Sequence, residues 1–103
     1  NTEMDGVFKA LADPTRRSIL RLLNERDMTA GEIAAHFAMS APSVSHHLAT
    51  LKHAELVCTR RDKQQIVYSL NATVIQEFLA LLFDAFAPVE PAPTTVEPVR
   101  SSP

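Results

Sequence analysis

Two helix-start signals lie close together in the middle of the chain, and this pair constrains the fold more than any other feature. Thr29 precedes Glu32 by three residues, which is the spacing of a capping box. The helix expected after it has an apolar stripe of Ile33, Ala34 and Phe37. Ser40 can cap a second helix with apolar positions at i, i+4 and i+7, namely Val44, Leu48 and Leu51. Two short helices separated by about three residues predict a helix-turn-helix.

Two further helices are expected before this motif. Residues 4–11 place three apolar side chains on one helical face, namely Val7, Phe8 and Leu11. Pro14 disfavours helix at the residue before it and suits a first helical position, so Asp13 is the expected N-cap of a second helix. That helix is predicted to end between Asn24 and Asp27.

A hairpin and a last helix are expected after the motif. Residues 56–61 and 65–70 are partly alternating and β-branched, and they flank the polar turn 62–64. Asn71 can cap a final helix whose apolar band is wider than one core-facing stripe needs. The predicted class is mostly α with a small β-hairpin (α+β), in the order α-α-α-α-β-β-α of a winged helix-turn-helix.

The chain has 103 residues, enough for one domain, predicted here as residues 1–86. Residues 87–103 contain five prolines, which block helix propagation, so a disordered or extended tail is expected. Cys58 is the single cysteine, so no internal disulfide can form. The sequence has neither a signal peptide pattern nor a long apolar run, and it predicts a cytoplasmic protein with no membrane partner.

The formal net charge of −2 argues against a simple basic nucleic-acid binder. The distribution is uneven, because residues 1–70 hold nine Lys and Arg against eight Asp and Glu, whereas residues 71–103 hold only Arg100 against four acidic residues. Basic side chains and histidines gather between residues 40 and 70. We therefore expect a modest basic surface on a mildly acidic protein.

Several segments resemble the ArsR/SmtB family of bacterial repressors. They read Phe-Lys-Ala-Leu-Ala-Asp-Pro-Thr-Arg-Arg at residues 8–17, Ser-Ala-Pro-Ser-Val-Ser-His-His-Leu at 40–48, Leu-Val at 56–57 and Tyr-Ser-Leu at 68–70. The resemblance covers about residues 7–83, and it is strongest to the metal-free, SdpR-like autorepressor branch. It implies a sequence-specific DNA-binding repressor, and the autorepressor branch implies autoregulation.

Two positions depart from the family pattern. Glu55 stands where the family usually has glycine in Ala-Gly-Leu-Val, and the hairpin turn 62–64 lacks the common glycine. Either change could alter the geometry of a turn.

Short polar side chains on an exposed helix face can read base edges in a major groove. The candidates in the second helix of the motif are Ser40, Ser43, Ser45, His46, His47 and Thr50. Adjacent residues on a helix point about 100° apart, so one histidine is expected to face DNA and the other the protein.

The charged hairpin offers phosphate contacts from Arg60, Arg61, Lys63 and Gln65. The alternatives are an ordinary solvated helix face and a charged edge that discourages strand pairing. Arg16 and Arg17 are expected chiefly to pair with acidic neighbours.

The resemblance places a homodimer interface on the first and last helices. Its candidate residues are Val7, Phe8, Leu11, Phe78, Leu79, Leu82, Phe83 and Phe86. A two-fold dimer would set two recognition helices roughly 34 Å apart and predicts an inverted-repeat operator in double-stranded DNA. The alternative is that all these side chains serve the core of one chain.

No metal site, cofactor or enzyme activity is expected. The helix expected after Thr29 has no thiol, and the last has no histidine to join Glu77 and Asp84. Ser45 and His46 lack the orienting acid of a catalytic site. Cys58 is expected to be a small buried hydrophobe. Two other functions stay open, namely a winged-helix module that binds protein, and a repressor that responds to a thiol oxidant or to an unidentified small-molecule or protein inducer.

Overall fold

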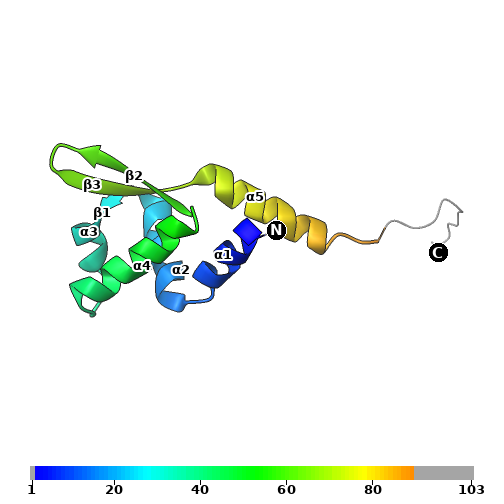
Figure 1. Ribbon diagram of the computed structural model, residues 1–103, viewed down its shortest axis with the longest axis horizontal. Coiled ribbons are helices and arrows are strands. Elements are labelled where there is room, and N and C mark those ends of the chain that lie inside the picture. Colours follow the sequence, from blue (N-terminus) through cyan, green and yellow to red (C-terminus); the bar gives the residue numbers. More distant parts are fainter. Residues whose placement is uncertain (1, 90–103) are drawn as a thin grey trace, which may run out of the picture.

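The computed structural model describes residues 2–89, and side chains from Met4 onward. The elements in chain order are α1 (Thr2–Leu11), α2 (Pro14–Glu25), β1 (Met28–Thr29), α3 (Ala30–Ala34), α4 (Ala41–His53), β2 (Val57–Asp62), β3 (Gln65–Leu70) and α5 (Ala72–Ala85). The predicted fold class is confirmed (Figure 1). Most of the predicted tail lies outside the described residues, and the domain boundary at residue 86 stays a prediction.

The N-caps predicted from the sequence are all present. The side chains of Asp13, Ser40 and Asn71 each accept a hydrogen bond from the backbone N–H three residues later. Thr29 and Glu32 form a complete capping box, in which the Glu32 carboxylate accepts the Thr29 N–H at 2.9 Å. Each of these caps satisfies backbone donors that the first helical turn leaves without partners.

The structure adds a short strand that the sequence did not predict. Met28 pairs with Tyr68 and Thr29 with Val67, so the sheet has the order β1-β3-β2. Two residues are too few to show an alternating pattern, and the strand exists only because β3 lies beside it. Thr29 is both the end of β1 and the N-cap of α3, which ties the β2–β3 hairpin directly to the helix-turn-helix.

Helix α3 is shorter than its apolar stripe predicted. It ends at Ala34, and turns carry the chain from there to the Ser40 cap. Phe37 still packs against the core from this turn region. The connection between α3 and α4 is therefore longer than the expected three residues.

The core lies where the helix-turn-helix meets α1, α2 and the base of the hairpin. Its largest fully buried side chains come from five segments and are Val7, Ile19, Ile33, Leu48, Leu51 and Leu56. Val7 is only 1% exposed, so its predicted place in a dimer interface is wrong. The residue faces inward because the face of α1 that carries Val7 and Ala10 packs against this core.

Helix α5 leaves the helical body at one end of the molecule, opposite the tip of the hairpin (Figure 1). No residue of α5 is buried. Phe78 packs its ring edge against Phe8 of α1, with ring centroids 5.2 Å apart. Beyond this contact Phe83 and Phe86 are 77% and 83% exposed. The wide apolar band of α5 is thus only partly used by the chain itself.

The position of Glu55 and one residue of the turn 62–64, where the family pattern has glycine, adopt the left-handed backbone region. Glu55 has φ 63° and Lys63 has φ 61°. After α4, the N–H of Glu55 donates to Lys52 O at 2.9 Å, and the N–H of Leu56 donates to Leu51 O at 3.0 Å. This pattern is the Schellman motif, in which glycine is the usual left-handed residue. The backbone makes the same turn in spite of the missing glycine.

Replacing Glu55 with glycine is expected to raise the free energy of unfolding by up to about 1 kcal/mol. The change relieves a left-handed penalty of roughly 1–2 kcal/mol, which outweighs the added freedom of the unfolded chain, about 0.4–1 kcal/mol. Urea denaturation followed by circular dichroism measures the difference. Glu77→Gly is the matched control, because the same exchange within helix α5 should lower stability by about 1 kcal/mol. Equal destabilisation by both variants would contradict the interpretation.

Candidate nucleic-acid interface

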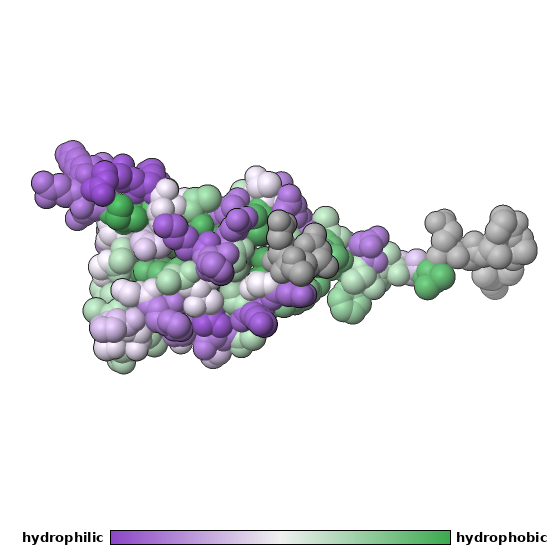
Figure 2. All heavy atoms as spheres, in the orientation of Figure 1, coloured by the Kyte–Doolittle hydropathy of each residue, from purple (hydrophilic) through white to green (hydrophobic). Residues whose placement is uncertain are grey.

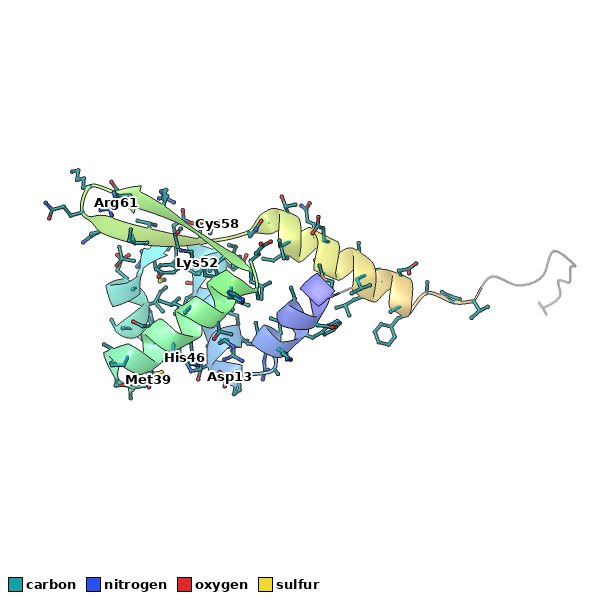
Figure 3. The ribbon with its side chains drawn as sticks, viewed as in Figure 1. Asp13, Met39, His46, Lys52, Cys58 and Arg61 are labelled. Carbon is teal, nitrogen blue, oxygen red and sulfur yellow. The ribbon has the colours of Figure 1, made fainter. Side chains whose placement is uncertain are left out.

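Helix α4 is buried on one side and open on the other. Val44, Leu48 and Leu51 are buried, whereas Ser43, Ser45 and His46 are exposed. The open side continues beyond the predicted residues, through Ala49, Lys52 and His53. The positions of Ser45, Ala49 and Lys52 at i, i+4 and i+7 were a signal available in the sequence that the prediction did not use. Lys52 adds a positive charge to this face (Figure 3).

Some of the predicted hydroxyl groups are already engaged within the helix. Ser40 Oγ accepts the Ser43 N–H at 3.3 Å and donates to Ser43 Oγ at 3.0 Å. Thr50 Oγ1 donates to His46 O at 3.1 Å. Among the described residues Ser45 makes no side-chain hydrogen bond. Its hydroxyl is therefore the one on this face best able to meet an external group.

The two histidines of α4 differ, as their angular separation predicted. His46 is exposed, whereas the His47 side chain is 17% exposed and turns toward the start of α2. There His47 Nδ1 lies 3.2 Å from Arg16 Nη1 and 3.8 Å from Asp13 Oδ2. His47 is thus the histidine whose Nδ1 atom faces the protein, and direct DNA contact by either histidine stays a prediction.

Arg16 and Arg17 stabilise the carboxyl end of α1. Arg16 donates from Nε to Ala10 O at 2.7 Å and from Nη2 to Lys9 O at 3.1 Å. Arg17 donates from Nη1 to Leu11 O at 2.7 Å. Carbonyls in the last turn of a helix lack intrahelical partners and carry partial negative charge, which a guanidinium satisfies. The expected pairing with acidic neighbours is therefore replaced by pairing with main-chain oxygens.

The hairpin, called the wing from here on, extends past the helices at the end of the molecule away from α5 (Figure 1). Figure 2 shows hydrophilic side chains gathered on it. Arg60 is held in an ion pair with Asp27, with Nη1 2.7 Å from Oδ2. Arg61, Lys63 and Gln65 are exposed without an ion pair among the described residues. The Arg60 side chain is thus engaged within the chain, and the other three are better placed to meet a ligand.

Cys58 is exposed on β2, so the prediction of a buried thiol is wrong. Alternate residues of a strand face opposite sides, and here Val57 takes the inward position while Cys58 points outward. The thiol-responsive alternative stays a prediction.

Within residues 2–89 no three His, Cys, Asp or Glu residues are grouped as a metal site would require. None of the helices in the described part of the chain is both long and apolar enough to cross a bilayer.

Helix α4 is buried on one face and polar and open on the other, and it lies next to a basic wing. This arrangement defines a winged helix-turn-helix DNA-binding domain. Solved structures support this class. An ArsR-like transcriptional regulator from Rhodococcus sp. RHA1 aligns with a TM-score of 0.77 and 28% identity over 84% of this chain and 81% of that one. The homodimeric winged helix-turn-helix domain of Mb0332 from Mycobacterium bovis aligns with a TM-score of 0.68 and 29% identity, over 82% and 79%.

Sequence comparison leads to a particular family within this class. Residues 13–59 match the model described as bacterial regulatory protein, arsR family. The chain is 60% identical over 74 residues to the transcriptional repressor SdpR of Bacillus subtilis, which is 72% of this chain and 82% of SdpR. It spans 62% of the regulator KmtR of Mycobacterium tuberculosis at 46% identity. The chain belongs to the bacterial ArsR family, as its sequence segments predicted, and is a DNA-binding transcriptional repressor.

The Asp13 cap predicts a particular response to acid. Its carboxylate accepts the Arg16 backbone N–H at 3.1 Å, which holds the pKa of Asp13 below its ordinary value of 3.8. A lowered folded pKa contributes stability that is fully present above the ordinary value and is lost as the pH falls through the folded pKa. Asp13→Asn keeps an oxygen that can cap the helix but removes this titration. Urea midpoints of the variant should therefore fall less steeply below pH 3.8.

Asp84→Asn is the charge-matched control, because Asp84 lies near the end of α5 and not at a helix start. Equal acid sensitivity of wild type and Asp13→Asn would show that the cap does not contribute in this way.

Proposed function

We propose that the chain acts as a homodimer on an inverted-repeat operator, with α4 of each subunit in a major groove and the wing against the adjacent backbone. It acts in the bacterial cytoplasm. One of its operators lies in the DNA upstream of its own gene. Occupation of that site represses transcription. The observation that carries this proposal is the open polar face of α4 beside the exposed wing residues Arg61, Lys63 and Gln65.

Base readout is assigned to the exposed side chains of α4. Ser45 has a hydroxyl that can donate to or accept from any base edge, and His46 presents a ring nitrogen. Ser43 lies in the first turn of the same helix. Lys52 and the wing side chains supply phosphate contacts, which give affinity and register but little sequence information.

The dimer proposal rests on the unused apolar surface of α5 and α1. Phe8, Leu79, Phe83 and Phe86 are between 45% and 83% exposed. Leu11, Phe78 and Leu82 are half-buried at its margin. Contiguous apolar surface of this kind marks an interaction site, and closed two-fold pairing is the commonest way to bury it. The related Mb0332 domain is homodimeric.

Footprinting on the chain's own upstream DNA, and selection from a random pool of duplexes, test the proposal. The expected result is a protected inverted repeat with half-sites about one helical turn apart. Affinity should fall steeply with added salt, since each neutralised phosphate contributes nearly one unit of log-log slope. A protein-binding module would give no protected or selected duplex, and that result would refute the proposal.

Ser45→Ala and Lys63→Ala should affect DNA binding in different ways. Loss of a base contact weakens binding to the selected duplex but leaves non-specific affinity nearly unchanged. Loss of a phosphate contact weakens binding to all duplexes and reduces the salt slope by about one. Fluorescence anisotropy at several salt concentrations measures both effects. Arg21→Ala on α2 is the control for loss of one positive charge, and an identical response of all three variants would contradict the assigned roles.

The double variant Leu79→Glu, Phe83→Glu is expected to be a folded monomer with weak operator affinity. Both side chains are exposed in the single chain, so the fold should survive, whereas two carboxylates cannot be buried in a dimer at low cost. Sedimentation velocity gives the oligomeric state. Gln76→Glu adds charge at another exposed position of α5 and should leave the dimer intact. A persistent dimer of the double variant would overturn this interface.

A further inference from the structure

Arg16 lies where three helices meet. Its Nε and Nη2 atoms donate to the last carbonyls of α1, and its backbone N–H belongs to the first turn of α2. Its remaining nitrogen, Nη1, lies 3.2 Å from Nδ1 of His47 on α4. The side chain is therefore fixed at several points, and its third contact reaches the helix that carries the polar face.

The contact between Arg16 and His47 determines where the proton of the histidine ring lies. A guanidinium has only N–H donors and stays charged, so Nδ1 of His47 has to be the acceptor. A neutral imidazole that accepts at Nδ1 carries its hydrogen on Nε2. Asp13 Oδ2, which accepts the Arg16 backbone N–H, is 3.8 Å from the same Nδ1, beyond hydrogen-bonding distance. The shorter contact decides the tautomer.

The other side of the ring has no such partner. Among the described residues His47 Nε2 makes no hydrogen bond, although the side chain is 17% exposed. The neighbouring His46 ring is 6.1 Å away between centroids and tilted. An N–H at this position is satisfied by water in the free protein and is available to an acceptor from outside the chain.

We propose that Arg16 is a positioning residue, which fixes His47 as an Nε2–H donor to an acceptor atom of the operator. The inference rests on the proposed function of α4. The acceptor is either a phosphate oxygen or a purine N7 atom at a base edge, both of which accept a single N–H. Arg16 itself touches no DNA. It acts by removing the alternative tautomer, in which His47 would present an unprotonated nitrogen to the same acceptor atom.

The tautomer can be measured on the free protein without any DNA. Long-range ¹H–¹⁵N spectra of labelled protein in mildly alkaline buffer distinguish a protonated ring nitrogen from an unprotonated one. Wild-type His47 should show hydrogen on Nε2 alone. Arg16→Ala should give a mixture of both tautomers, whereas Arg17→Ala should not. Arg17 is the matched control, because it also caps α1 with a guanidinium but contacts only Leu11 O. Hydrogen on Nδ1 in the wild type, or an unchanged tautomer in Arg16→Ala, would overturn the proposal.

A double-mutant cycle tests the consequence for DNA. The probe is the duplex protected or selected in the experiments on the proposed function. Arg16→Ala should weaken its binding by the inverse of the fraction of His47 that keeps hydrogen on Nε2, roughly twofold for an equal mixture of tautomers. In His47→Gln the amide nitrogen replaces Nε2 and there is no tautomer to fix, so adding Arg16→Ala there should leave the affinity unchanged. Equal losses in both backgrounds would show that Arg16 supports the fold and nothing more.

The source of the acceptor is settled by modified duplexes. If it is a purine N7, a 7-deaza base at one operator position should remove the difference between wild type and Arg16→Ala. If it is a phosphate, a neutral methylphosphonate should do so. A difference that survives every substitution would refute the contact. If no duplex binds at all, the proposed function fails with it, while the tautomer experiment still decides how Arg16 acts on His47.

Discussion

The structure depends on burying one face of α4. Val44, Leu48 and Leu51 are each at most 2% exposed, and they pack with Ile19 of α2 and Ile33 of α3. Burial of each such side chain contributes about 1.5–3 kcal/mol, so three of them are comparable to the whole net stability of a small domain. Because the same helix is core on one side, its opposite face cannot rotate away from solvent. The position of the open polar face is thus fixed by the packing behind it.

Much of this arrangement could be predicted because its signals are local. The caps at Asp13, Thr29, Ser40 and Asn71 need only a side chain and the next three residues, and the hairpin needs only two alternating runs. The features that escaped prediction depend on partners far along the chain. Strand β1 is defined by β3, and the contact between Arg16 and His47 joins residues 31 positions apart.

Two errors have the same origin. Val7 was assigned to the interface from the family resemblance and Cys58 to the core from residue type, yet each is placed by the orientation of its element. A helix face or a strand face can be inferred from the pattern, but which apolar face meets the core and which stays open depends on packing. The two glycine departures had a different outcome. Glu55 and the turn 62–64 were noted as unusual, and positive φ occurs at Glu55 and, within that turn, at Lys63.

The two residues of β1 have a wider consequence. They join the root of the wing to the cap of α3, and Arg60 adds an ion pair to Asp27 just before them. The spacing between the wing and the helix-turn-helix is therefore set mainly by main-chain hydrogen bonds. A scaffold of this kind can change its target by exchanging a few outward residues, while the spacing of the contacts that it can make stays the same.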